Sequence, residues 1–572
     1  MSASAVNESS AKGKDTLRLV GKQPEFFPGM VGGLRHPSAI ATFEVTGAVP
    51  ADLERLDRCM QSFFPEPQTL APPETSEPGL ALLRRVHEWQ SALQRESGIP
   101  VFGPCLVRPL RQRPGSNRSA RLYALVIPYV APQATLASLR WVVSAVSHGL
   151  AGDRLPAGSR SVLVEELATV SDLLKGFGYR TTNPMHFLAA ADRLGVPFAR
   201  MGHGVFAFGL GEHCRWLNSS ITDKTPSIGV TLARDKHESA SILRRFGLPV
   251  PAHVMVSNEE QAVRAARHFG FPVVVKPNDQ EQGRGVFAGL LTEEDVRSSF
   301  REASQFSKKI LVEKHVHGED FRFTVFQGRV VKIMHRRPGG VSGDGRNTIA
   351  SLLKEVQAWP EHQRALRRHG TYRLQMDQEA LGMLREQGLS PESVPEPGQF
   401  VPLRRKSNIS SGGSHHIIAL EQTHPDNRAV AVRACATLEL DLAGVDLILR
   451  DPALPWHETG GAICEINAQP QIGIRDTPDI YADILWGLIG GDGSIDVHVL
   501  LLGGTANEAS FAFEERWQAA RSLGCNALST PGGAWVEGTQ CVWRPDNGFV
   551  AARALLHDKR VQALYCVLTV SD

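Results

Sequence analysis

A lysine at the end of a predicted strand is the first residue in this chain that could bind phosphate. Lys276 closes the apolar run 273–276 and precedes a loop that contains Gly283, Arg284 and Gly285. An ammonium group supplies a point charge, and glycines let backbone N–H groups approach phosphate oxygens. The loop is not a Walker A sequence, because it lacks the G-x-x-x-x-G-K-[ST] pattern. A lysine that simply reaches solvent is the alternative.

Three oxygen-bearing side chains near residue 450 could hold a divalent cation. Asp446 interrupts the apolar run 442–449, and Glu465 and Asn467 stand two residues apart in the run 462–467. The two-residue period of a strand places Glu465 and Asn467 on one face. Carboxylate and amide oxygens are ligands that Mg²⁺ accepts, together with phosphate oxygens of a nucleotide. The alternative is a buried carboxylate paired with an arginine.

A strand predicted over 310–316 could contact a nucleoside. Backbone groups between Glu313 and Val316 could read an adenine, and a carboxylate in the following segment 318–322 could hold a ribose hydroxyl. An ordinary edge strand with a charged turn explains the same pattern.

Two polar turns could contact the reacting end of a substrate. Arg336 lies beside a glycine-containing turn, and the segment with Asn408, Ser410 and Gly412 offers hydroxyl groups and a flexible backbone. Each turn alone is also compatible with an ordinary polar loop.

Composition limits the classes of protein that remain. The 572 residues predict roughly three to four domains. Lys and Arg number 62 and Asp and Glu 60, a net charge of +2, which excludes nucleic-acid binding through overall charge alone. No apolar run is long enough for a membrane helix, and the polar N-terminus does not resemble a secretory signal. The eight cysteines form no C-x-x-C pair, which favours a reducing, cytoplasmic location.

The order of predicted elements indicates an α+β or α/β multidomain protein. Residues 1–15 are predicted to be disordered, and residues 16–221 to form an α+β N-terminal domain. Residues 222–493 alternate short strands with amphipathic helices, interrupted by a lid or insertion at 359–406. That insertion carries a basic cluster that includes Arg404 and Arg405, which could guide peptide carboxylates or simply cover a solvated face.

The segments that carry the candidate residues occur in an order that resembles the ATP-grasp ligases, and among them the cyanophycin synthetases. The resemblance covers near half the chain. It rests on Val274-Val-Lys276-Pro, Gln282-Gly-Arg-Gly-Val, Leu311-Val-Glu313-Lys, Gly318-Glu-Asp-Phe-Arg322, Asn408-Ile-Ser-Ser-Gly-Gly, Ala443-Gly-Val-Asp446 and Glu458-Thr-Gly-Gly-Ala-Ile-Cys-Glu465-Ile-Asn467. It implies a domain of two α+β lobes that enclose ATP and Mg²⁺.

The resemblance also implies roles for single residues. ATP contacts are implied for Lys236, Lys276, Gly283, Arg284, Gly285, Glu313, Val316 and Glu319, with Glu313 at the adenine and Glu319 at the ribose. Mg²⁺ ligands are implied at Asp446, Glu465 and Asn467. Catalytic contacts are implied for Arg336, Asn408, Ser410 and Gly412.

The C-terminal region departs from that family. Full-length members continue into a Mur-ligase-like domain that opens with a phosphate-binding loop containing a lysine. At the matching place this chain has Glu508, and a carboxylate there repels phosphate. Residues 494–572 are therefore interpreted as a truncated, degenerate Mur-like α/β remnant, similar to that of the second-type cyanophycin synthetases.

The resemblance implies ATP-dependent ligation of a carboxylate to an amine through an acyl phosphate. The hypothesis is the extension of a cyanophycin-type peptide by β-aspartyl-arginine dipeptides or by Asp. The alternatives are a ligase that makes another small peptide, and a non-catalytic partner of a full-length synthetase. The family also implies a homo-oligomer, while neither nucleic acid nor membrane is an expected partner.

Overall fold

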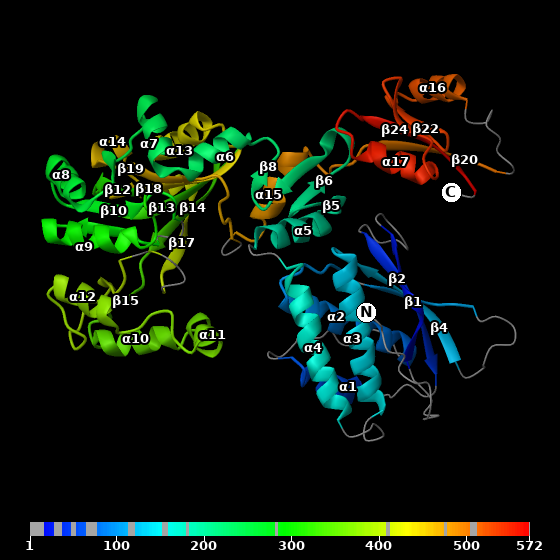
Figure 1. Ribbon diagram of the computed structural model, residues 1–572, viewed down its shortest axis with the longest axis horizontal. Helices are drawn as coiled ribbons and strands as arrows, with labels where there is room; N and C mark the ends of the chain where they lie inside the picture. The colour runs from blue at the N-terminus through cyan, green and yellow to red at the C-terminus, as the bar shows by residue number, and fades with distance from the viewer. Residues whose placement is uncertain are drawn as a thin grey trace. The chain divides into compact units, whose positions relative to one another are not determined.

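The protein is described from a computed structural model (Figure 1). It describes residues 17–570 except 28–36, 47–52, 65–76, 104, 112–119, 152–157, 179–181, 281–283, 406, 408–411, 474–476 and 504–511. The predicted disorder of residues 1–15 therefore lies outside the described residues. Two compact units divide the chain: Met1–Ser219 with Pro478–Asp572, and Ser220–Thr477.

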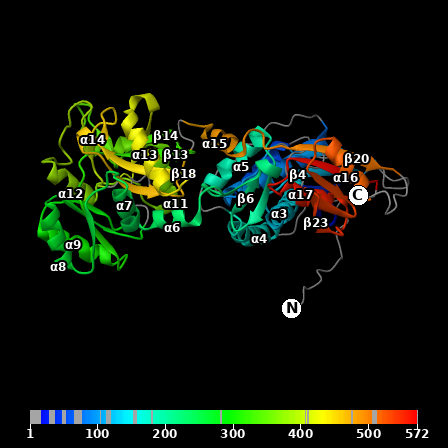
Figure 2. The ribbon, with the colours of Figure 1, turned by 90° about the horizontal axis from the view of Figure 1, so that it is seen from above.

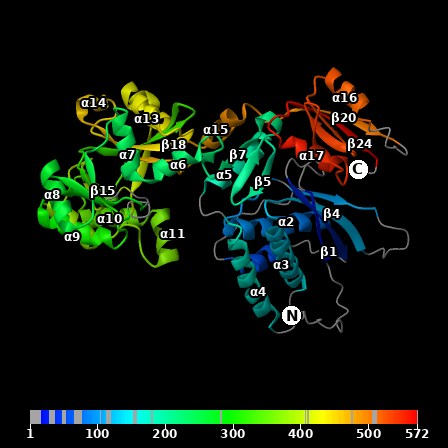
Figure 3. The ribbon, with the colours of Figure 1, turned by 45° about the horizontal axis from the view of Figure 1, so that its top comes forward.

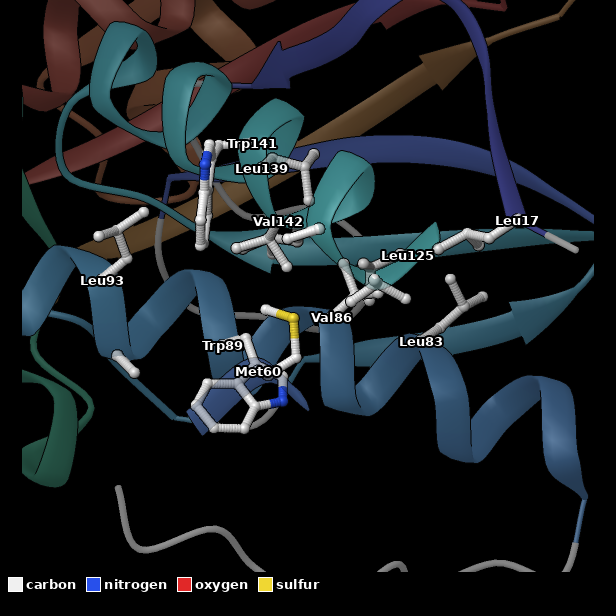
Figure 4. Close-up of a cluster of buried hydrophobic side chains, with 14 of the residues drawn as sticks. Leu17, Met60, Leu83, Val86, Trp89, Leu93, Leu125, Leu139, Trp141 and Val142 are labelled. Atoms are coloured by element: carbon white, nitrogen blue, oxygen red, sulfur yellow. The ribbon is translucent and has the colours of Figure 1, made fainter. Parts of the chain in front are cut away.

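An antiparallel sheet and four helices make up the N-terminal α+β region. The sheet has the order β1-β2-β4-β3, formed by Leu17–Phe27, Ser38–Thr46, Ala120–Pro128 and Leu106–Pro109. The helices are α1 (Leu53–Gln61), α2 (Pro78–Glu96), α3 (Pro132–Ala151) and α4 (Ser159–Lys175). Their apolar faces meet in one core, where Met60, Trp89 and Trp141 are buried (Figure 4).

A helix from late in the chain joins this first unit. Helix α15 (Ile480–Ile489) lies beside α5 (Asn183–Leu194) (Figure 3). The Tyr481 hydroxyl donates to Asn183 Oδ1 at 2.7 Å, and its ring meets Phe187 edge-on. The second compact unit ends at Thr477, whereas the sequence places the domain end at residue 493. Strands β5 (Phe198–Gly202), β6 (Val205–Phe208) and β7 (Arg215–Asn218) follow α5 as an antiparallel group.

The C-terminal region forms the predicted short α/β element. Its sheet has the order β20-β24-β21-β22-β23, formed by Asp496–Leu502, Ala563–Thr569, Ala527–Thr530, Gly533–Val536 and Thr539–Trp543. Strands β20 and β21 both run parallel to β24, and helices α16 (Phe513–Ser522) and α17 (Gly548–Leu556) complete two small cores. Glu508 lies outside the described residues. No helix in the described part of the chain is long and apolar enough to cross a membrane.

The unit Ser220–Thr477 contains two α+β lobes, as the sequence predicts. The first has the antiparallel sheet β11-β10-β12-β9, formed by Phe287–Leu290, Val273–Pro277, Ile310–Lys314 and His253–Val256. Helices α8 (Glu259–Phe269) and α9 (Glu293–Ser304) cover it with a shared apolar core. Asn258 caps α8 by accepting from the Gln261 N–H, which satisfies one of the free donors of the first helical turn.

The second lobe has the antiparallel sheet β17-β14-β13-β18-β19. Its strands are Ser414–Ile418, Arg329–Arg337, Glu319–Phe326, Leu442–Leu449 and Ala462–Asn467. Helix α13 (Pro425–Thr437) lies along this sheet (Figure 2), and α6 (Ser227–Arg234) and α7 (Lys236–Arg245) contribute to the same core. The short helix α14 (Trp456–Thr459) precedes β19, and β8 (Ile221–Thr222) opens the unit.

The predicted insertion is a small folded element that begins earlier than expected. It contains β15 (Gly340–Ser342), α10 (Ile349–Gln357), α11 (Pro360–His369), α12 (Gln378–Glu386) and β16 (Phe400–Pro402). Because β15 pairs with β16 and Val341 lies in the element's own core, this folded element includes residues before the predicted start at residue 359. Arg404 does not belong to an exposed basic cluster, since it is buried and bonded to Asp377 at 2.7 and 2.9 Å.

This ion pair predicts unequal effects at two adjacent arginines. Arg404→Met should destabilise the insertion by about 1–3 kcal/mol, because hydrogen bonds to a charged group are lost from a buried position. Arg405→Met is the matched control, since the Arg405 side chain is 41% exposed and pairs with Glu386, whose side chain is 54% exposed. Hydrogen exchange of α12 should accelerate in the first variant only. Equal acceleration in both variants would contradict the structural role of Arg404.

Candidate functional site

One face of the five-stranded sheet collects charged side chains from four adjacent strands. Arg322 on β13 lies opposite Asp446 on β18, which in turn lies opposite Glu465 on β19. Arg336 on β14 lies opposite Asp320 on β13. The alternate residues of these strands, such as Phe321, Phe323, Val445 and Leu447, fill the apolar core on the other face. The alternation of side chains along each strand therefore separates a charged face from a buried apolar one.

A β-bulge brings Glu465 onto the charged face. Ile463 and Ile466 both pack in the apolar core although they are three residues apart, which strict alternation does not allow. The register shifts between Asp446 and Leu447, so that the extra residue on β19 is Cys464. Beyond the bulge, Glu465 lies opposite Asp446, and Asn467 lies opposite Gly444 on the same face.

Asp446 lies at the centre of the charged face. Its carboxylate is 6% exposed and accepts from the Arg322 Nε and, at 2.8 Å, from the Arg322 Nη2. Arg336 Nη2 lies 2.8 Å from Asp446 Oδ2 and 2.7 Å from Asp320 Oδ1. Burial opposes ionisation of Asp446, but the two guanidinium groups outweigh it and hold its pKa below the usual value. At Asp320 burial prevails and raises the pKa despite the contact with Arg336.

Two lysines bring further positive charge to this region. Lys276 Nζ on β10 lies 2.8 Å from Glu313 on β12, and both side chains are 8% exposed. Burial alone would lower the pKa of Lys276, but Glu313, helped by Glu465, raises it. Lys236 is the first residue of α7, and its Nζ lies 3.1 Å from Glu465 and 2.6 Å from the Gln280 carbonyl oxygen. Burial raises the pKa of the Cys464 thiol. The nearby charges of Lys276 and Asp446 act on this pKa in opposite directions, Lys276 lowering it and Asp446 raising it.

The remaining residues predicted to contact ATP lie in different surroundings. Arg284 lies with its guanidinium 4.8 Å from the centre of the Phe306 ring, beside Gly285, whose φ of +71° favours glycine. Val316 follows β12 and is half-buried. Glu319 pairs with His335 at 2.8 Å instead of joining the charged face.

Only part of the predicted substrate end is described. Gly412 has a φ of +87°, and a Cβ atom there would lie 2.7 Å from the Leu374 Cβ, so the backbone passes directly over the insertion. Gly283, Asn408 and Ser410 lie outside the described residues.

The chain has recognisable relatives. A family model described as an ATP-grasp domain matches residues 231–320, which include Lys236, Lys276 and Glu313. The cyanophycin synthetase of Trichormus variabilis is 29% identical over 367 residues, which cover 62% of this chain and 39% of that protein. The cyanophycin synthetase of Geminocystis herdmanii is 28% identical over 400 residues, which cover 68% of this chain and 43% of that protein.

Part of the chain thus matches an ATP-grasp domain, and the longer matches are to cyanophycin synthetases. The chain spans less than half the length of the two cyanophycin synthetases it matches, at 39% and 43%. The glutathione biosynthesis bifunctional protein GshAB of Clostridium perfringens is 31% identical over 277 residues, which cover 47% of this chain and 35% of that protein.

The charged face has the donor types that a magnesium ion accepts. Asp446, Glu465 and Asn467 lie on one face of adjacent strands, and the Asn467 side-chain nitrogen is buried without a hydrogen-bond partner. Among the described residues, no group of three or more His, Cys, Asp and Glu side chains is arranged to hold a metal by itself. Two carboxylates and one amide fit Mg²⁺ only when phosphate oxygens complete its shell.

Asp320 and Arg322 also belong to this charged face, although the sequence analysis assigns them no role. The alternation of polar and apolar residues over 319–326 is the signal that could have identified them. The residues predicted for one candidate site, Lys236, Lys276, Glu313, Arg336, Asp446, Glu465 and Asn467, all lie around the two sheets of this unit. Asp446 pairs with arginine, which was the predicted alternative to metal binding, and its role as a metal ligand stays a prediction.

The Lys276–Glu313 ion pair predicts a non-additive effect on stability. Lys276→Met should cost about 3–5 kcal/mol, because it leaves a buried carboxylate unpaired. Lys276→Met combined with Glu313→Leu should recover most of that loss. The pKa of Lys276 is raised in the folded protein above its ordinary value of 10.5. The ion pair therefore contributes fully to the free energy of unfolding below pH 10.5, and this contribution is lost only as the pH rises through the higher folded pKa.

Urea unfolding at pH 7.5 therefore measures the fully formed pair. The free energies of unfolding of the two single variants and the double variant make a double-mutant cycle. Additive losses would show that the pair is not coupled and would contradict this geometry.

Proposed function

We propose that this chain is an ATP- and Mg²⁺-dependent ligase that joins a carboxylate to an amine through an acyl phosphate. The observation that carries the proposal is the charged face around Asp446, with Lys236 and Lys276 beside it. Such a face offers cations for phosphate oxygens and carboxylates for a metal ion in one place. The ATP-grasp match over residues 231–320 supports ATP as the nucleotide.

The first step would transfer the γ-phosphoryl group of ATP to a substrate carboxylate. A carboxylate oxygen forms the new bond to phosphorus, and ADP leaves as the old bond breaks. Lys236 and Lys276 would hold the phosphates, and Mg²⁺ held by Asp446, Glu465 and Asn467 would neutralise their charge when bound. Phosphoryl transfer needs positioning and charge neutralisation more than a protein nucleophile.

The second step would form the amide. The nitrogen of the incoming amine attacks the carbonyl carbon, the phosphate leaves, and the nitrogen loses a proton. Arg336 and Arg322 lie beside Asp446 and would stabilise the negative charge that develops on the carbonyl oxygen or the leaving phosphate.

The finer substrate assignment follows the relatives. Identity to cyanophycin synthetases extends over as much as 68% of this chain, farther than the 47% matched to GshAB, which favours a cyanophycin-type peptide over a glutathione-like product. We propose that β-aspartyl-arginine dipeptide, or Asp, is joined to the carboxyl end of the growing peptide. Self-association, a cytoplasmic location and the ribose role of Glu319 stay predictions.

ADP release tests this assignment directly. Purified protein with ATP, Mg²⁺, a short cyanophycin primer and β-aspartyl-arginine should release ADP and lengthen the primer, and Asp in place of the dipeptide is the parallel reaction. Lys276→Met should abolish turnover, whereas Lys354→Met, an exposed lysine on α10, should retain it. ATP binding without turnover of either substrate would direct attention to another amine. Absence of ATP binding would support the non-catalytic partner instead.

Arg336 should contribute to the rate more than to nucleotide binding. Arg336→Met is expected to lower kcat by roughly 100- to 1000-fold, the usual effect of removing one donor to a developing negative charge. The KM for ATP should change little, because Lys236 and Lys276 remain. A rise in the KM for ATP with kcat unchanged would contradict the role given to Arg336.

A further inference from the structure

Lys332 is a buried cation beside the charged face that neither the sequence nor the proposed mechanism uses. It lies on β14, is 3% exposed, and occupies the same face as Arg336, four residues further along the strand. Its ammonium donates to the carbonyl oxygens of Ile472 at 3.1 Å and Gly473 at 3.0 Å, and to the Thr477 hydroxyl at 2.7 Å. These acceptors all belong to the segment that follows β19.

The cross-strand register links Lys332 to Asn467. Lys332 lies opposite Thr324, Thr324 opposite Gly444, and Gly444 opposite Asn467, so that one row crosses four strands. Four strands span about 14 Å, and five residues of extended chain reach about 17 Å. Residues 468–473, here termed the strap, leave the sheet after Asn467 at one end of this row and return to Lys332 at the other.

The strap is also held in the middle. Pro470 packs over Gly444, where a Cβ atom would lie 3.0 Å from the Pro470 ring, and the Pro470 carbonyl oxygen accepts from the buried Ser220 hydroxyl at 2.8 Å. Ile472 is buried at 1% exposure. The strap therefore crosses the sheet along a defined path and is fixed near Gly444 and at Lys332.

The next row of the sheet contains the reactive groups. It runs through Met334, Arg322, Asp446 and Glu465, two residues along each strand from the Lys332 row. Two residues of strand correspond to about 7 Å, so the two rows lie about 7 Å apart. The strap consequently forms a wall beside Asp446 and Glu465 and continues directly from Asn467.

We propose that Lys332 is a positioning residue that fixes the strap as the wall against which the substrate carboxylate is held. This inference rests on the proposed ligase function. Lys332 touches no reacting atom and acts through the strap. An ammonium suits this task, because its tetrahedral donors can reach three separate oxygen acceptors at once. The nucleotide phosphates are bound by Lys236 and Lys276, which lie on other elements, so loss of Lys332 should affect the acceptor and not the nucleotide.

The test compares Lys332→Met with Arg329→Met, an exposed residue on the same strand. Hydrogen exchange in residues 468–473 should accelerate at least tenfold in Lys332→Met and remain unchanged in Arg329→Met. Affinity for a non-hydrolysable ATP analogue with Mg²⁺, measured by calorimetry, should stay within threefold of wild type in both. With the acceptor that wild type uses, kcat/KM for that acceptor should fall by about 10- to 100-fold in Lys332→Met, since small misplacements carry penalties of this size.

Unchanged exchange of the strap would overturn the proposal. So would equal losses for nucleotide and acceptor together with a lowered Tm, because those indicate general destabilisation. If Lys332→Met fails to fold, Thr477→Val removes one acceptor of the ammonium and should accelerate strap exchange in the same direction. A wild-type protein that is inactive with every cyanophycin-type substrate would contradict the proposed function, while strap exchange and analogue affinity would still decide the role of Lys332.

Discussion

The buried charges on the sheets of its two lobes determine how the rest of the unit Ser220–Thr477 must be built. Asp446 and Lys276 are almost fully buried, and a buried charge without a partner costs several kcal/mol. Each is therefore paired, Asp446 with two arginines and Lys276 with Glu313. These partners come from different strands, so the pairs form only when the strands adopt one register. A slip of one residue would exchange Arg322 with Phe321 or Phe323 and bury the wrong face.

The same charges explain how this face could accept a nucleotide without a large electrostatic penalty. Lys236, Lys276, Arg322 and Arg336 are matched in number by Glu313, Asp320, Asp446 and Glu465, and these eight groups sum to zero formal charge. The buried Lys332 adds one positive charge beside them. A polyphosphate with its divalent cations also brings both signs. Cation side chains can turn from carboxylate to phosphate while the carboxylates take up the metal, and the net charge of the site is preserved. This exchange of partners reconciles the observed ion pairs with the proposed metal role.

Local patterns in the sequence were sufficient to find the strands that carry the candidate residues. An apolar run interrupted by Asp446 identified β18, the two-residue spacing of Glu465 and Asn467 identified β19, and an apolar run ending in a lysine identified β10, because these signals depend only on neighbouring residues. The end of the unit at Thr477 could not be found in this way. Helix α15 is apolar along most of its length, and its partner, α5, lies almost 300 residues earlier in the chain, as the Tyr481–Asn183 bond shows. The predicted insertion does not include β15 for the same reason, since β15 is recognisable only through its pairing with β16.

The sequence around Cys464 contains a signal for the β-bulge in β19. Alternation through Glu465 and Asn467 predicts their shared face correctly, yet the spacing of Ile463 and Ile466 contradicts simple alternation over the whole strand. Both isoleucines are buried in the same core, so one extra residue must lie between them outside the ladder. A strand without the bulge would turn Glu465 away from Asp446 whenever Ile463 is buried. The three-residue spacing of Ile463 and Ile466 is thus the sequence signal for the β-bulge that places Glu465 opposite Asp446. This signal depends only on residues within β19.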